Sequence, residues 1–369
     1  LPATPPALPV AQVPIFTAIT MTNVKSFPLQ LILRKFRVKG QRRRYRTFRN
    51  QQGFTLVELM IALALGLVIS GVSIKMYLES RRSYIQDEEM ARLQENARFA
   101  IDFLKREISL SGFLAGINDT SGLNAATITT DCNAAGTDWV LDLNSAIELI
   151  NNAPTGGTLM TLNGTELSCI NADEIVDGTD IISLKRTSDT ATLNNGVLQA
   201  TPSLNTWYLK KFDYTSYSWS YLTGGITAAE STPNSTYDYW RYFTNIYYIR
   251  DYSVSEGDEI PTLCVSMLEG SEMINRCLIE GIEDIQIEIG IDNDGDNVVD
   301  QYKNAPSATD FDNALSVRLH ILARSISPVS GYTNRKKFRL GVKNIDAFND
   351  SYLRKVFSTT IKLRNTDLG

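Results

Sequence analysis

The longest hydrophobic segment of the chain covers residues 53–74 and reads GFTLVELMIALALGLVISGVSI. From Phe54 to Ile74 nearly every position is apolar, and the segment contains one acid, Glu58, near its beginning. At about 1.5 Å of rise per residue, a helix of this length spans roughly the 30 Å hydrocarbon core of a bilayer. Since a helix satisfies its own backbone hydrogen bonds in lipid, the pattern predicts a transmembrane helix over residues 54–74.

Helical periodicity continues beyond this segment. Residues 75–110 contain no proline or glycine, and apolar side chains recur at spacings of three and four. This pattern is typical of an amphipathic helix that lays one face on a globular domain. One continuous helix is therefore expected from near Phe54 to about Leu110, ending by Gly112, with residues 75–111 as its amphipathic half. Its apolar stripe consists of Met90, Leu93, Ala97, Ala100, Ile101, Leu104 and Ile108, whereas Glu95, Asn96, Asp102 and Arg106 point away from it.

After Gly116 the composition changes to Thr, Asn, Ser, Gly and Asp, and short apolar runs alternate with turn residues. Such runs predict strands, and the alternation in 282–291 and 315–323 is typical of antiparallel sheet with one buried face. The expected fold class is α+β, with the long helix packed on an antiparallel β-sheet domain over residues 112–369. The predicted strands lie within 137–143, 157–164, 178–187, 205–214, 217–225, 245–253, 262–268, 282–291, 314–324 and 356–365.

The stretch 207–248 holds three of the four Trp residues and many Tyr residues. Aromatic side chains on sheets commonly pack across neighbouring strands and into the core. An exposed adhesive surface for a neighbouring molecule is the alternative. Packing is favoured, because single aromatic residues on a sheet need no functional explanation.

Charge is distributed unevenly along the chain. Residues 1–53 contain ten Lys and Arg residues and no acid, while the whole chain has a formal net charge of −5, which leaves −15 for residues 54–369. The basic run 34–49 directly precedes the apolar segment, so the positive-inside rule places it in the cytoplasm and places the chain after Lys75 in the periplasm. A nucleic-acid patch is the less favoured interpretation of this run, and the acidic remainder argues against nucleic acid as a partner.

Four cysteines follow the predicted membrane span, in a compartment that is oxidising. They are Cys132, Cys169, Cys264 and Cys277. Four cysteines allow three connectivities, of which 132–169 with 264–277 is favoured because both bridges are local. Each bridge is expected to stabilise the fold by about 2–4 kcal/mol. Unpaired buried thiols are a weaker alternative, and a zinc site is weaker still because no CxxC spacing occurs.

The loop 292–300 reads DNDGDNVVD and offers several oxygen ligands at spacings that suit calcium. The candidate ligands are Asp292, Asp294, Asp296, the carbonyl of Val298, and Asp300. The loop is not an EF-hand: Asn297 replaces the usual Gly, Lys303 stands where a bidentate Glu is required, and the flanks read as strands. A solvated hairpin turn is the alternative, since Asp, Asn and Gly are common turn residues. A bound Ca²⁺ is favoured because closely packed acids repel one another without a cation.

The sequence gives no support for an enzyme. The single histidine, His320, lies in an alternating strand pattern and cannot serve a Ser-His-Asp or Cys-His arrangement with any specificity. A phosphate-binding GxxxxGK[ST] loop does not occur. Paired acids such as Glu88 and Glu89 are more often part of a solvated helix face than an acid–base dyad.

Residues 53–58 read Gly-Phe-Thr-Leu-Val-Glu, directly after the basic segment and at the start of the apolar helix. This stretch resembles the class III signal of type IV prepilins. The resemblance implies that a prepilin peptidase cleaves after Gly53, removes residues 1–53 and methylates the new amine of Phe54. It also implies that Glu58 guides docking into the growing filament by neutralising a neighbour's amine. An acid that stays hydrated near the interface is the alternative for Glu58.

Four further stretches, 89–116, 178–186, 278–302 and 353–365, are similar to minor pilins of the PilW kind. The resemblance covers residues 54–369 from end to end, although the middle from about 190 to 245 looks individual. It implies a pilin-like fold and a minor pilin of a type IV pilus, first anchored in inner-membrane lipid and then placed near the pilus tip. Its implied partners are other minor pilins, the major pilin, the prepilin peptidase and the assembly platform.

Two alternatives to this function stay open on the sequence. A pseudopilin of type II secretion would share the cleavage signal and the use of Glu58. A membrane-anchored periplasmic enzyme or binding protein would keep the apolar helix as an ordinary anchor.

Overall fold

The computed structural model describes residues 53–117, 139–212 and 216–365, together with Leu123, Ala126, Ile128, Asp131 and Cys132. The predicted leader before Gly53 lies outside the described residues. By its internal contacts the chain divides into two units, residues 1–63 and residues 64–369.

Helix α1 covers Leu56–Leu110 without interruption. The predicted helix is therefore confirmed in both extent and continuity. It ends where Gly112 adopts a φ of 74°, a left-handed conformation that suits glycine. A side chain at this position would also collide with the backbone carbonyl of Asn365, so the helix ends where the carboxyl-terminal segment crosses it. Within the described residues, α1 is the one helix long and apolar enough to cross a membrane.

The apolar stripe of α1 packs on the β domain as expected. Leu93, Ala97, Ala100, Leu104 and Ile108 are buried, and Met90 and Ile101 are partly buried against the same core. The expectation that Asn96 points away is wrong, because its side-chain amide donates a hydrogen bond to the carbonyl of Glu280 at 3.1 Å. This bond joins the helix to the edge of a sheet.

The first sheet has nine strands, all antiparallel. Its central strands follow the order β1-β2-β7. Strand β7 is long enough to pair with β5 along its first part and with β8 along its last part. The strands are β1 (Ile147–Ala153), β2 (Thr179–Thr187), β3 (Leu193–Asn194), β4 (Val197–Leu198), β5 (Thr206–Lys211), β6 (Tyr217–Leu222), β7 (Asp238–Arg250), β8 (Thr262–Glu269) and β9 (Glu272–Glu280).

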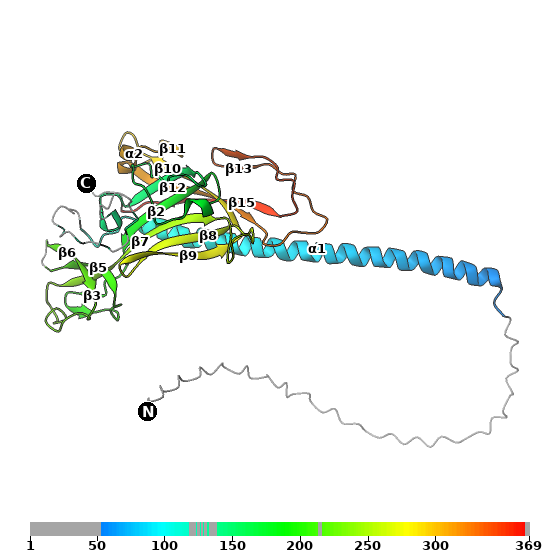
Figure 1. The fold of residues 1–369 in the computed structure, drawn as a ribbon, viewed down its shortest axis with the longest axis horizontal. Helices are drawn as coiled ribbons and strands as arrows, with labels where there is room; N and C mark the ends of the chain where they lie inside the picture. The colour runs from blue at the N-terminus through cyan, green and yellow to red at the C-terminus, as the bar shows by residue number, and fades with distance from the viewer. Residues whose placement is uncertain are drawn as a thin grey trace, which may run out of the picture. The chain divides into compact units, whose positions relative to one another are not determined.

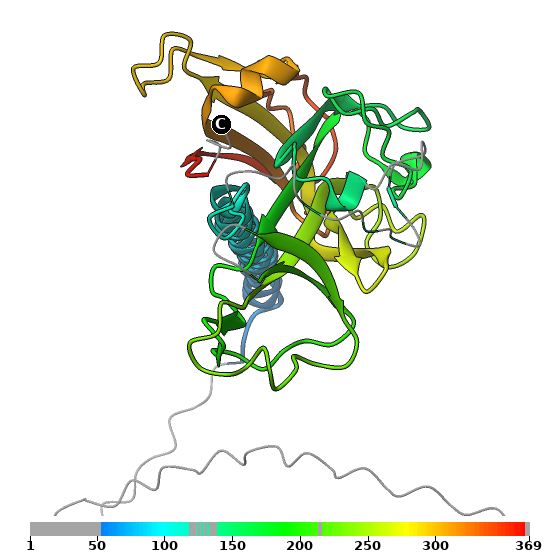
Figure 2. The ribbon, with the colours of Figure 1, turned by 90° about the vertical axis from the view of Figure 1, so that its left-hand side faces the viewer.

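The second sheet has the order β11-β10-β12-β15, and a separate hairpin consists of β13 and β14. Figure 1 shows the two sheets and the helix, and Figure 2, which looks nearly along α1, shows strands of both sheets arranged around it. The elements are β10 (Ile282–Ile291), β11 (Gln301–Lys303), β12 (Ala314–Arg324), β13 (Phe338–Leu340), β14 (Lys343–Ile345), β15 (Arg354–Lys362), the short helix α2 (Ala308–Asp312) and the 3-10 turns η1 (Trp139–Leu141) and η2 (Ala172–Glu174).

One hydrophobic core joins the helix to both sheets. Leu104 of α1 is buried in the same cluster as Ile182 of β2, Ile249 of β7, Ile287 of β10 and Leu319 of β12. Burying one such side chain contributes about 1.5–3 kcal/mol, so the apolar stripe is a main source of cohesion between helix and sheets. The predicted α+β fold, with a long helix on antiparallel sheet, is confirmed.

Two of the predicted strands are wrong. Within the predicted strand 137–143, the described residues begin at Trp139 and form the 3-10 turn η1 over Trp139–Leu141. The Asp131 carboxylate accepts hydrogen bonds from the backbone N–H groups of Trp139 and Val140 and so replaces a strand partner. The segment 157–164 makes a single isolated bridge, between Met160 and Glu166.

Two of the longer strands were missed. Strand β9 (EMINRCLIE) is an exposed edge strand with little alternation, and β1 (IELINNA) is short and has two consecutive Asn residues before its last residue. Both lack the period-two pattern on which strand prediction depends.

The aromatic stretch 207–248 packs inward, as favoured from the sequence. Trp207 and Trp219 are 7 % and 8 % exposed. The Trp219 ring lies 4.6 Å from the ring of Tyr242 and 6.4 Å from that of Trp207, both edge to face. Such pairs add to the stabilisation from burial itself.

Candidate functional site

The apolar end of α1 begins with a reciprocal pair of hydrogen bonds between Thr55 and Glu58. The backbone N–H and the hydroxyl of Thr55 both donate to Glu58 Oε2 at 3.1 Å. The backbone N–H of Glu58 donates to Thr55 Oγ1 at 3.2 Å. This arrangement is a capping box, which satisfies backbone donors at the start of a helix. Thr55-x-x-Glu58 before an apolar run is the sequence signature of this box, so it was predictable from the sequence.

The bond between Gly53 and Phe54 lies just before the helix. The side chain of Phe54 is 88 % exposed, and a Cβ added at Gly53 would meet no heavy atom within 4 Å. Among the described residues, none packs closely against either Gly53 or Phe54. The capping box places the Glu58 carboxylate in the first turn, where a negative charge also suits the positive end of the helix dipole.

The amphipathic half of α1 is fixed to the sheet by a buried ion pair. Arg186 of β2 binds the Glu107 carboxylate through two nitrogens, with Nη2 to Oε1 at 2.8 Å and Nε to Oε2 at 3.1 Å. The two side chains are 10 % and 9 % exposed. Asn245 of β7 donates a further hydrogen bond to Glu107. Because a bidentate guanidinium–carboxylate pair has a fixed geometry, it sets the position of the helix on the sheet.

Strand β2 also carries a buried lysine whose side chain lies on η1. Lys185 Nζ donates to the backbone carbonyls of Trp139 and Asp142 at 2.7 and 2.9 Å and lies 3.8 Å from the Glu148 carboxylate. Burial lowers the pKa of Lys185 to about 8, although the nearby carboxylates oppose this shift. The lysine therefore fixes η1, and its bonds to these two carbonyls explain further why residues 139–143 do not form a strand.

Asp180 is the third buried charge of β2 and joins the two sheets. Its carboxylate accepts hydrogen bonds from the backbone N–H groups of Asn152 at 2.9 Å and of Ile287 in β10 at 2.7 Å. Burial raises the pKa of Asp180 to about 7, against the effect of these backbone donors. All nine residues of β2 are buried, so this strand connects the helix, η1 and the second sheet through its charged side chains.

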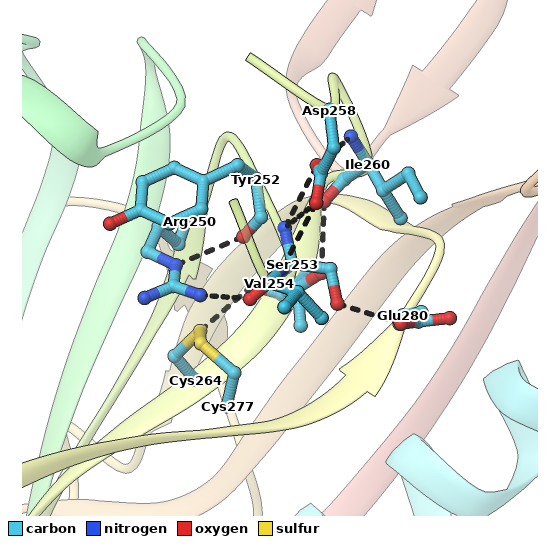
Figure 3. The surroundings of a disulfide bond; sticks show 10 residues. Arg250, Tyr252, Ser253, Val254, Asp258, Ile260, Cys264, Cys277 and Glu280 are labelled. Atoms are coloured by element: carbon cyan, nitrogen blue, oxygen red, sulfur yellow. Dashed lines mark hydrogen bonds between the residues drawn. A yellow bond between two sulfur atoms is a disulfide. The ribbon is translucent and has the colours of Figure 1, made fainter. Parts of the chain in front are cut away.

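Both favoured disulfides are present, Cys132 to Cys169 and Cys264 to Cys277. The second bridge joins directly paired residues of β8 and β9 (Figure 3). Beside it, the Asp258 carboxylate accepts backbone N–H groups of the β7–β8 loop, from Ser253, Val254, Ser255 and Ile260. The edge hairpin and the neighbouring loop are therefore held by covalent and polar links at the same end of the sheet.

The acidic loop connects β10 to β11 and brings together part of the predicted ligand set. Oxygens of Asp292, Asp294 and Asp300 lie within 4.8 Å of one another. Asp296 is not part of this cluster, and its Oδ1 instead accepts the backbone N–H of Val298 at 2.8 Å.

The same loop has the bonds of a tight turn. The two oxygens of Asp292 accept the backbone N–H groups of Gly295 and Asn297 at 2.7 and 2.8 Å. Asn297 has a left-handed φ of 64°, which Asn tolerates better than most residues. Lys303 binds Asp310 at 2.8 Å. Three clustered carboxylates fit the chemistry of a hard cation such as calcium. The Asp292 carboxylate also closes the turn itself, by accepting backbone N–H groups of the loop.

Two protein-family models match this chain, one at the predicted cleavage signal and one over the carboxyl-terminal half of the β domain. The family model described as Type IV Pilus-assembly protein W matches residues 246–365, and the model described as Prokaryotic N-terminal methylation motif matches residues 48–74. The search of curated proteins and the search of solved structures returned no match. The two family matches together confirm the resemblance to a PilW-like type IV pilin.

Proposed function

We propose that this minor pilin takes part in the assembly and priming of a type IV pilus, near its tip, and so supports pilus biogenesis, twitching motility and adhesion. The observation that carries the proposal is a single uninterrupted helix that begins at a methylation signal and ends against a β domain. Helix packing between subunits supplies the cohesion of the filament. The role is structural, with no reaction of its own.

In this proposal the chain is first a single-pass protein of the inner membrane with its β domain in the periplasm. The prepilin peptidase cleaves after Gly53 and methylates Phe54. Residues 54–74 lie in lipid, and residues 75–111 carry the β domain of residues 112–369. The partners are the major pilin, other minor pilins and the assembly platform.

Deleting the gene tests this function against a role in type II secretion. Loss of twitching with normal secretion supports the pilus. Loss of secretion with normal twitching would instead identify a pseudopilin. Amino-terminal sequencing of the membrane-purified protein separates both from an ordinary anchored periplasmic protein, because such a protein does not begin at Phe54.

The role proposed for Glu58 can be separated from its role in the capping box. We expect Glu58→Ala to leave cleavage after Gly53 intact but to reduce incorporation into pili strongly, because both the charge and the cap are lost. Glu58→Gln keeps an acceptor for the Thr55 N–H and removes only the charge, since Gln also serves in capping boxes. Incorporation of both variants is measured by immunoblot of sheared pili.

Glu58→Ala removes both features, so Glu58→Gln is the variant that distinguishes the two roles. If the carboxylate neutralises a neighbour's amine, Glu58→Gln is incorporated as poorly as Glu58→Ala. If Glu58→Gln is incorporated like the unmodified protein, the charge-pairing role is wrong and the cap is what matters.

We also propose that the acidic loop binds Ca²⁺ through Asp292, Asp294 and Asp300. Adding calcium to the full chain in detergent micelles is expected to raise its melting temperature. At a calcium concentration about 100 times the dissociation constant, binding stabilises the fold by about 2.7 kcal/mol, which corresponds to roughly 5–10 °C for a domain of this size. Differential scanning calorimetry with calcium and with chelator measures the shift.

Two variants locate the calcium effect. Asp300→Asn removes one charge of the cluster and is expected to abolish most of the shift, whereas Asp296→Asn, outside the cluster, keeps it. The calcium hypothesis is abandoned if calcium changes neither the melting temperature nor the protease resistance of the unmodified protein.

A further inference from the structure

The hairpin of β13 and β14 lies against the second sheet without joining it (Figure 1). Among the described residues, its two strands pair with each other and with no other strand. Its Leu340 side chain is fully buried, whereas Lys337, Arg339 and Val342 are exposed. A two-stranded hairpin is at best marginally stable in water, so this one depends on the surface that it covers.

The sheet face next to the hairpin is polar. Glu288 and Gln286 of β10 share this face with Arg318 and His320 of β12, to which they are directly paired. Gln286, Glu288 and His320 are nevertheless at most 9 % exposed. Lifting the hairpin would therefore hydrate polar and titratable groups rather than apolar ones.

The tip of the hairpin fits closely over His320 and Glu288. A Cβ added at Gly341 would lie 2.7 Å from Glu288 Oε1 and 3.2 Å from His320 Cδ2, so glycine is what lets the tip approach both side chains. The Arg339 guanidinium is held at the same tip, because its Nε donates to the Gly341 carbonyl at 2.9 Å. A second attachment is the ion pair between Lys343 of the hairpin and Asp284 of β10, at 2.7 Å.

His320 is the single histidine of the chain, and both of its ring nitrogens have partners. Its Nδ1 lies 2.7 Å from Ser358 Oγ in β15, and its Nε2 lies 3.5 Å from Glu288 Oε2. The Glu288 carboxylate is shared with Arg318, at 3.3 Å. The imidazole is thus placed between one carboxylate and one guanidinium of the sheet and the two basic side chains of the hairpin.

We propose that His320 is an acid-operated release for this hairpin: protonation of the imidazole loosens the hairpin from the second sheet. Histidine side chains gain their charge between pH 5 and 8. Under the closed hairpin, the new charge is poorly hydrated and faces Arg339, whereas water solvates it once the hairpin lifts. Glu288 attracts the proton in both forms and does not decide between them. Because the open form binds the proton better, acid favours opening by the same factor.

The test is hydrogen–deuterium exchange of the full chain in detergent micelles, read by mass spectrometry of peptides from residues 335–346. Exchange is measured at about pH 8 and about pH 5.5, near the two ends of the range in which histidine gains its charge. After division by the intrinsic rates, we expect protection of the hairpin to fall at least about threefold at the lower pH, since one linked proton allows up to about tenfold per pH unit. Peptides from β12 serve as the internal control and should keep their protection.

Three variants locate the effect. His320→Gln keeps hydrogen-bonding groups but cannot gain a charge, so protection of the hairpin should be equal at the two pH values. Arg339→Gln leaves His320 in place and removes the charge at the tip, so it should reduce the pH effect even if the first variant folds poorly. Lys337→Gln is its matched control: this lysine lies on the same hairpin, is 77 % exposed and pairs with Asp346, and its loss should leave the pH effect unchanged.

The proposal is overturned if protection of the hairpin is the same at both pH values, if it rises at the lower pH, or if His320→Gln keeps the pH effect. An equal change in Arg339→Gln and Lys337→Gln would overturn the part assigned to Arg339. None of these measurements depends on cleavage or on pili. Failure of the proposed function would therefore show in the cleavage and twitching assays, and failure of the release would show only here.

Discussion

Gly53→Val is expected to abolish processing, so that the protein isolated from membranes no longer begins at Phe54 and is absent from sheared pili. The reason is recognition by the peptidase. A Cβ at Gly53 would meet no heavy atom within 4 Å, so the chain itself has room for the larger side chain. Amino-terminal sequencing and mass spectrometry of the membrane-purified protein measure the outcome.

Gly66→Ala is the matched control for this experiment. Gly66 lies in the apolar half of α1, thirteen residues after Gly53, and a Cβ there also meets nothing within 4 Å. We expect this variant to be processed normally. Processing of Gly53→Val at the normal site would contradict the assignment of the cleavage signal and, with it, the proposed function.

Arg186→Met is expected to destabilise the β domain by about 3–5 kcal/mol, because it leaves the Glu107 carboxylate buried without its partner. The loss should appear as a lower midpoint in urea unfolding of the full chain in micelles. The adjacent ion pair between Arg106 and Asp189 supplies the control. It has side chains 68 % and 54 % exposed, and Arg106→Met should cost at most about 1 kcal/mol.

The double variant Glu107→Leu with Arg186→Met tests the origin of this loss. Replacing both charges by apolar side chains removes the unpaired carboxylate, so we expect it to recover most of the stability lost in Arg186→Met. The buried pair is not what fixes the helix if Arg186→Met costs no more than Arg106→Met.

The sequence predicted the structure best where apolar side chains repeat at one regular spacing over many residues. The continuous helix followed from apolar side chains every three or four residues, and its end at Leu110 followed from the approach to Gly112. Strands β10 and β12 were predicted to the residue, because period-two alternation runs through their whole length. The methylation signal was equally clear, because it is a compact motif with fixed spacing.

What the sequence could not indicate were the contacts between distant residues. Arg186 and Glu107 are 79 positions apart, and each alone resembles an ordinary surface charge. Within 137–143, apolar residues suggested a strand, but Asp131 and Lys185 satisfy its backbone groups from elsewhere in the chain. Charged residues in an apolar run, such as those of β2, are buried only when the fold brings their partners to them.

The pair between Arg186 and Glu107 has a consequence for a subunit that is drawn out of a membrane. A pulling force on α1 acts along the helix axis and passes into the β domain through the apolar stripe and through this pair, which lies about one turn before Leu110. There it must shear a two-point ionic contact in the protein interior while the apolar stripe slides as a whole. Because the force runs along the helix axis, the ion pair and the apolar stripe resist it together, and the helix carries the β domain with it.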